Sequence, residues 1–86
     1  MNERRSYEPV LSSQAIGLLM SLTKARQQKL IQLLRQLAET PGQVDDYFEF
    51  DDTGRDIQFI LIRDFLIAYW ADHAVREFRI VRIDEA

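Results

Sequence analysis

Four arginines in the second half of the chain are the residues best suited to bind a phosphate group: Arg55, Arg63, Arg79 and Arg82. A guanidinium group is always charged and can donate two parallel hydrogen bonds to phosphate oxygens. Arg55, Arg63 and Arg79 are therefore candidate catalytic residues, and Arg82 is a candidate contact to a partner. Arg79 and Arg82 are three residues apart. On a regular strand they point to opposite faces, and only a bulge would bring them into one patch.

Ordinary ion pairing is the alternative interpretation of these arginines, and it is the one we favour. The carboxylates near them in the sequence are those of Asp56, Asp64, Asp72 and Glu77. Exposed pairs of this kind are common and add little to stability.

His73 is the only histidine of the chain. Beside Asp72 it is a further catalytic candidate, as a general base or a single metal ligand. It lies in a predicted turn, and the chain has no cysteine or second histidine to complete a site, so a simple turn histidine is the favoured interpretation. We predict no metal site and no cofactor.

Six acidic residues lie close together in residues 45–56: Asp45, Asp46, Glu49, Asp51, Asp52 and Asp56. A calcium loop needs a glycine and a closing glutamate at fixed positions, and neither is in place here. We interpret the run as a solvated loop.

Charge is distributed unevenly in the 86 residues. The net charge is −3, but residues 1–43 carry +3 and residues 44–86 carry −6. Only the first half could offer a basic surface to nucleic acid, and the second half would repel phosphate. The absence of cysteine excludes disulfides and thiolate zinc sites and fits a reducing cytoplasm. No run of residues is apolar enough to suggest a secretory signal or a membrane span.

The apolar pattern predicts helices in the first half. Residues 6–11 form an edge strand, since Pro9 excludes a helix and a central strand. Helices follow at 13–22 and 25–39, the first capped by Ser12 or Ser13. Ile16 and Met20 widen the apolar stripe of the first helix, which indicates burial on more than one side. The short turn at 23–24 makes the pair an antiparallel αα-hairpin.

After Gly42 the pattern changes to a repeat of two residues. It predicts strands at 47–50, 57–62, 65–71 and 77–84, joined by connections short enough to require antiparallel pairing. The fold class is therefore α+β: an N-terminal edge strand, an αα-hairpin and a four-stranded antiparallel meander. Residues 1–86 form one domain.

Two groups of residues are candidates for binding a partner. Arg26, Lys29 and Arg35 lie on the polar side of the second helix, either as ordinary solvated surface, which we favour, or as a basic surface that steers an acidic partner. Tyr69 and Trp70 are neighbours on the central strand and point to opposite faces. One should pack beneath the helices and the other should lie on the open face, where an aromatic ring can contact a partner.

Two features of the sequence resemble a known family: the order of the elements, and the run from Arg55 to Trp70 with its step Ile67-Ala68-Tyr69. The family is the RelE/ParE superfamily of toxins from type II toxin–antitoxin modules. The strand at residues 78–83 is similar to the last strand of that family. The resemblance implies one of two activities: RelE-like cleavage of messenger RNA on the ribosome by lysines and arginines of the sheet, or ParE-like inhibition of DNA gyrase. It also implies neutralisation by an antitoxin and a role in plasmid stabilisation.

The chain departs from the RelE pattern where the catalytic cations should lie. Residues 57–61 contain no lysine, Leu66 stands where the family has an arginine, and the chain ends Asp84-Glu85-Ala86 without the further basic residue and tyrosine. The chain therefore lacks the cations that would stabilise the phosphate charge during cleavage.

We therefore expect a cytoplasmic toxin-like protein that acts by binding a macromolecular target, the ribosome or gyrase, and is neutralised by an antitoxin. One alternative is a ribosome-dependent mRNA endoribonuclease. Another is a non-toxic homo-oligomer, at least a homodimer, with a structural or regulatory role.

Overall fold

A computed structural model describes residues 7–39, 47–50 and 56–86 of the chain. The elements are β1 (Glu8–Leu11), α1 (Ser13–Ser21), α2 (Lys24–Glu39), β2 (Tyr47–Phe50), β3 (Asp56–Ile62), β4 (Phe65–Asp72) and β5 (Glu77–Glu85). This order confirms the predicted α+β fold, and the helix and strand limits agree with the prediction to within about two residues. The predicted turn at 51–54 and Arg55 lie outside the described residues.

The five strands form one sheet in the order β1-β5-β4-β3-β2. Strands β2 to β5 make the predicted antiparallel meander, and β1 pairs in parallel with β5 at the edge. Glu8 N–H donates to Arg76 O at 3.0 Å and Ser12 N–H donates to Ile80 O at 2.9 Å. The backbone N–H groups of the even-numbered residues therefore point toward β5. Pro9 lies between them, and its missing N–H falls on the outer edge, where no ladder bond is lost.

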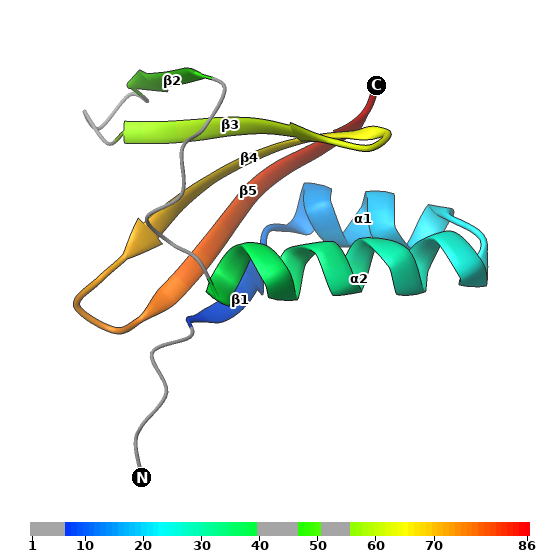
Figure 1. The fold of residues 1–86 in the computed structure, drawn as a ribbon, viewed down its shortest axis with the longest axis horizontal. Coiled ribbons are helices and arrows are strands. Elements are labelled where there is room, and N and C mark those ends of the chain that lie inside the picture. Colours follow the sequence, from blue (N-terminus) through cyan, green and yellow to red (C-terminus); the bar gives the residue numbers. More distant parts are fainter. Residues whose placement is uncertain (1–6, 40–46, 51–55) are drawn as a thin grey trace, which may run out of the picture.

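Both helices lie on one side of the sheet (Figure 1). They bury a single core whose strand members are the inward residues of β4 and β5. Buried members of the core are Ala15, Leu30, Leu33, Leu34, Leu37, Ala38, Phe65, Ile67, Tyr69, Phe78, Ile80 and Ile83. The sheet therefore has one helix-covered face and one face that no helix of the described chain covers.

Ser12 and Gln14 attach α1 to β5. Ser12 Oγ accepts from Ala15 N–H at 3.2 Å, which confirms the predicted cap, and donates to Val81 O at 2.8 Å. The Gln14 amide bonds both backbone groups of Ile83, at 2.8 and 2.9 Å. Beyond the end of β1, this side chain replaces a neighbouring strand at the edge of β5.

The expectation that α1 is buried on more than one side is wrong. Ala15 is fully buried and Leu18, Leu19 and Leu22 pack against the core, but Ile16 is 48% exposed and Met20 is 69% exposed. This nine-residue helix packs on the core with one side only, and its outer side is exposed to solvent.

Candidate functional surfaces

The alternation of β4 divides the sheet into two faces. Phe65, Ile67 and Tyr69 belong to the core, and Tyr69 is only 1% exposed. Trp70 is partly exposed on the other side. Residues opposite one another in the strand register share a face. The face turned away from the helices, here named the open face, therefore includes Glu8, Val10, Ile57, Phe59, Leu61, Leu66, Ala68, Trp70, Asp72, Glu77, Arg79, Arg82 and Asp84.

This division decides between the two aromatic candidates. Tyr69 stacks on Phe78 beneath the helices, with ring centroids 4.3 Å apart, so its ring is part of the core and cannot contact a partner. Trp70 is the aromatic of this pair that lies on the open face.

A β-bulge brings Arg79 and Arg82 onto the same face. Arg79 lies opposite Trp70 and Arg82 lies opposite Ala68, while Val81 has no partner in the register. The regular geometry that placed the two arginines on opposite faces is therefore wrong for this strand. The one extra residue of the bulge converts their spacing of three into the equivalent of two.

Both arginines of the open face are neutralised by carboxylates on their own strand. Arg79 Nη2 pairs with Glu77 Oε1, and Arg82 Nε pairs with Asp84 Oδ2 at 2.8 Å. The Arg79 guanidinium also lies 5.8 Å from the centre of the Trp70 ring, a cation–π contact. Ion pairing was the favoured interpretation: it holds for Arg79 with the expected Glu77, and Arg82 uses Asp84, which was not among the expected partners.

Arg63 and His73 both lie in turns. Arg63 is exposed in the connection between β3 and β4, with φ of 55°. His73 is exposed between β4 and β5, where its Nδ1 is 2.6 Å from Tyr7 Oη and ties the start of β1 to this turn. In the described part of the chain, no three His, Cys, Asp or Glu side chains are grouped so as to hold a metal ion.

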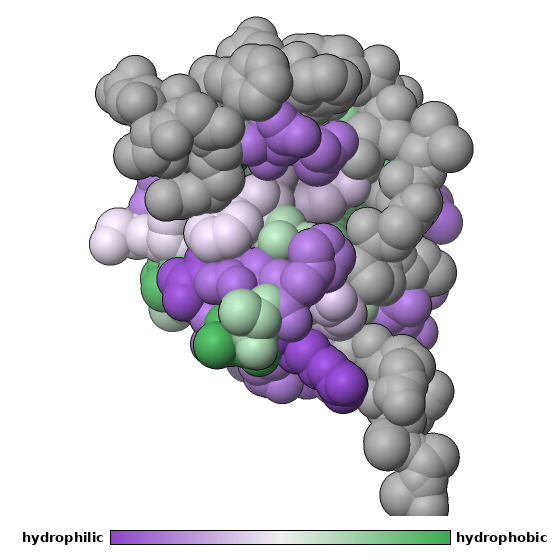
Figure 2. Space-filling model, turned by 90° about the vertical axis from the view of Figure 1, so that its left-hand side faces the viewer, coloured by the Kyte–Doolittle hydropathy of each residue, from purple (hydrophilic) through white to green (hydrophobic). Residues whose placement is uncertain are grey.

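The end of the molecule at the β4–β5 turn is mainly hydrophilic (Figure 2). Val75, in this turn, is 56% exposed.

The three candidate cations of α2, Arg26, Lys29 and Arg35, do not form one surface. Arg26 Nη1 pairs with Glu85 Oε2 at 2.7 Å, and its guanidinium lies 5.2 Å from the centre of the Phe65 ring. Lys29 is exposed. Arg35 lies nine residues after Arg26, about half a revolution around the helix at 3.6 residues per turn. It lines a groove on the far side of α2.

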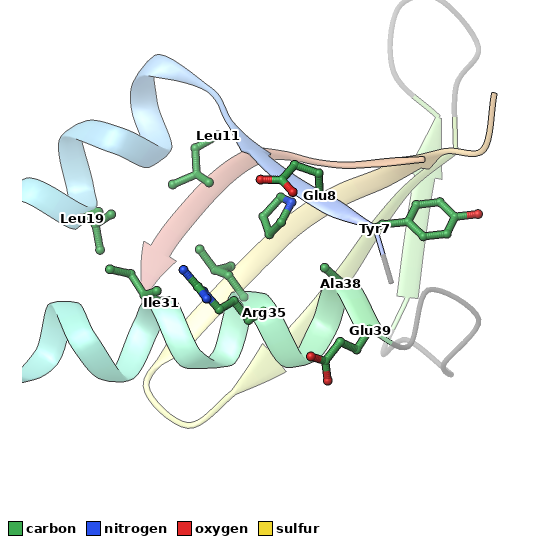
Figure 3. A pocket seen from close by; sticks show the side chains of 10 residues that line it. Tyr7, Glu8, Leu11, Leu19, Ile31, Arg35, Ala38 and Glu39 are labelled. Carbon is green, nitrogen blue, oxygen red and sulfur yellow. The ribbon is translucent and has the colours of Figure 1, made fainter. Parts of the chain in front are cut away.

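That groove, of about 380 Å³, lies between β1, α1 and α2 (Figure 3). Its lining residues are Tyr7, Glu8, Pro9, Leu11, Leu19, Ile31, Leu34, Arg35, Ala38 and Glu39. Sequence reasoning missed it because its walls come from three elements. The one available signal was Ile31, an apolar residue one turn before Arg35 on α2.

Comparison with known proteins identifies the fold. No protein-family model matches the sequence, and a search of curated proteins finds no relative. Among solved structures, the RelBE2 toxin–antitoxin complex from Mycobacterium tuberculosis matches with a TM-score of 0.75 at 14% identity, covering 95% of this chain and 100% of the other. The isolated RelE toxin of E. coli matches with 0.73 at 14%, covering 94% and 85%. The RelE–RelB complex of Pyrococcus horikoshii matches with 0.68 at 19%, covering 94% and 96%.

The expected resemblance is confirmed at the level of fold. The chain has the fold of the RelE toxins, at identities too low to transfer a target or a mechanism. In the described residues, no helix is long and apolar enough to cross a membrane.

Proposed function

We propose that this chain is the toxin component of a RelE-type toxin–antitoxin pair, which acts by binding a macromolecular target with its open face and is neutralised by an antitoxin protein. The fold supports this assignment, because the similar structures include RelE toxins in complex with RelB-type partners. The open face supports the mode of action, because it combines aromatic and aliphatic side chains with paired charges, the usual composition of a protein-binding surface.

The observation that carries the proposal is the neutralisation of both described arginines on this face. A phosphate group would have to displace Glu77 from Arg79 and Asp84 from Arg82 before either cation could stabilise it. Binding to a protein surface needs no such displacement. Trp70, held against Arg79, then supplies a large ring for the contact, and tryptophan is among the residues that contribute most to interfaces.

Growth on induced expression tests the proposal. The wild-type chain should arrest the growth of a bacterial host, and co-expression of the protein encoded by the adjacent reading frame should restore it. Trp70→Ala should relieve the arrest. Val75→Ala is the matched control, because Val75 is exposed in a turn outside the open face, and this variant should arrest growth like the wild type.

Two results would contradict this function. One is normal growth on induction of the wild-type chain at a level where the folded protein is detected. The other is an arrest that Trp70→Ala leaves unchanged, which would remove the open face from the mechanism.

Cleavage of messenger RNA is the second candidate, and the bulge in β5 is the observation that favours it. It places Arg79 and Arg82 on one face, where two guanidinium groups could hold a phosphate if the carboxylates moved away. Incubation with translating ribosomes, followed by mapping of message ends, separates the two candidates. New ends that disappear in Arg79→Ala would establish the nuclease, and intact messages during growth arrest would support action by binding.

A further inference from the structure

The position of the bulge in β5 decides which side chain lies beside Ala68 on the open face. Ile80 and Ile83 are both buried in the core, 1% and 0% exposed, although they are three residues apart. On a regular strand such residues point to opposite faces, so one extra residue has to lie between them. Burial of the two isoleucines does not decide whether that extra residue is Val81 or Arg82.

The two arrangements give the open face different charges. With Val81 as the extra residue, Arg82 lies opposite Ala68, as it does in this structure. With Arg82 as the extra residue, Val81 would take that place, and an aliphatic side chain would replace a cation. Both isoleucines stay in the core in either arrangement, so a contact outside the core has to make the choice.

Ser12, where β1 ends and α1 begins, bonds the backbone of the bulge directly. Its Oγ donates to Val81 O at 2.8 Å, and its N–H donates to Ile80 O at 2.9 Å. Successive carbonyl groups of a regular strand point to opposite edges, and here two of them point to the same edge. A bulge leaves the polar groups of its extra residue without a ladder partner. The hydroxyl group of Ser12 thus supplies the donor that Val81 needs as the extra residue.

Gln14 bonds the residue that follows the bulge. Its Nε2 donates to Ile83 O at 2.8 Å, and its Oε1 accepts from Ile83 N–H at 2.9 Å. Ile83 has the same place in the register whichever residue is the extra one. Gln14 therefore stabilises the end of β5 without selecting the position of the bulge, and the selection is left to Ser12.

Ser12 is itself fixed by the first turn of α1, which begins beside β5 (Figure 1). Its Oγ accepts from Ala15 N–H at 3.2 Å, and Ala15 is completely buried. A hydroxyl group has one proton and two lone pairs, so it can accept from the helix and donate to the strand at the same time. The bulge is thereby tied to an element that the core holds in place.

We propose that Ser12 is a positioning residue of the open face: its hydroxyl group holds the bulge at Val81 and so keeps Arg82 beside Ala68. Ser12 lies on the helix-covered side and does not contact the target itself. The inference rests on the proposed function for what the open face binds. It adds that one side chain on the opposite side of the sheet sets the spacing of Arg79 and Arg82.

Nuclear magnetic resonance of the full chain tests the register through the cross-strand contacts of Ala68. Ser12→Asp keeps an oxygen for the helix cap but cannot donate to Val81 O. It should reduce the Ala68–Arg82 contact at least twofold and produce an Ala68–Val81 contact. Ser12→Thr keeps the hydroxyl group and should show the wild-type register. Gln14→Met is the matched control, because it loses two bonds to β5 and should still keep that register.

Growth on induced expression connects the register with the function. Ser12→Asp should weaken the arrest as much as Arg82→Ala does, whereas Ser12→Thr and Gln14→Met should arrest growth like the wild type. Thermal unfolding shows that each variant folds. If Ser12→Asp does not fold, Ser12→Ala takes its place, because it removes the donor without adding a charge.

An unchanged Ala68–Arg82 contact in Ser12→Asp overturns the inference, and so does an equal loss of this contact in Gln14→Met. A Ser12 variant that loses the contact and still arrests growth like the wild type also overturns it. If the wild-type chain does not arrest growth, the proposed function fails, and the cross-strand contacts alone decide whether Ser12 holds the bulge.

Discussion

Tyr69 and Trp70 are adjacent in the sequence and have opposite surroundings. Tyr69 is 1% exposed and stacks on Phe78 in the core. Trp70 is partly exposed on the open face beside the ion-paired Arg79. The helix-covered face is built from close-packed apolar residues, and the open face mixes apolar side chains with charges that neutralise one another. The fold thus depends on one set of alternate residues, which leaves the other set available for function.

Deletion of Ala68 would break this division most severely. Without it, one half of β4 slips by one residue, so that either Tyr69 moves to the open face or Phe65 and Ile67 do. The loss of these core contacts is comparable with the roughly 5–15 kcal/mol that stabilises a domain of this size. We expect an unfolded chain by circular dichroism.

Deletion of Val81 is the matched control, because the bulge makes this residue extra in the register. Arg79 and Arg82 would then be separated by one residue and remain on the open face, while Ile80 and Ile83 remain in the core. The cost should be the hydrogen bond from Ser12 Oγ to Val81 O and the bonds from Gln14 to Ile83, which the shorter strand puts out of register, at about 1 kcal/mol each. A chain that unfolds on this deletion would show that the bulge is required for the fold.

Truncation of one aromatic side chain on each face should give the next largest difference in the free energy of unfolding. Phe78→Ala removes a fully buried ring and should lower the free energy of unfolding by about 3–5 kcal/mol. Trp70→Ala removes a partly exposed ring and should cost about 1–2 kcal/mol, because less of its surface leaves water on folding. Urea unfolding measures both values. Equal costs would mean that the open face contributes to the core as much as the covered face does.

Much of this arrangement could be predicted from the sequence. The change of apolar period near Gly42 predicted the helical hairpin and the meander, and Pro9 predicted an edge strand. The alternation within residues 65–71 also placed Tyr69 and Trp70 on opposite faces, as they are in the structure. These features follow from local patterns that a single element fixes by itself.

The surfaces were harder to predict, because they depend on contacts between distant elements. Nothing in the residues 79–82 distinguishes a bulged strand from a regular one, so the shared face of Arg79 and Arg82 could not be assigned. Which of Tyr69 and Trp70 is buried depends on the side that the helices cover. The groove forms only when Leu11, Leu19 and Ile31 meet.

Ser12 tests the attachment of the helices to the covered face. Ser12→Ala removes both the cap of α1 and the bond to Val81, and should lower the free energy of unfolding by about 1–2 kcal/mol. Thr23→Ala removes only the hydroxyl that accepts from Arg26 N–H, at 3.3 Å, and should cost less. If urea unfolding gives the reverse order, the link between α1 and β5 does not hold the helix in place.

The smallest expected change in stability concerns the charges of the open face, and it also distinguishes the two candidate functions. Glu77→Gln with Asp84→Asn removes two partly exposed ion pairs, each contributing about 0–1 kcal/mol. The same change frees Arg79 and Arg82, so binding of single-stranded RNA, measured by fluorescence anisotropy, should rise several-fold and weaken with added salt. Gln and Asn keep the shape of the side chains, so the rise is due to charge. Unchanged RNA binding would mean that the two carboxylates do not restrain the arginines, and the argument against phosphate chemistry on this face would fail.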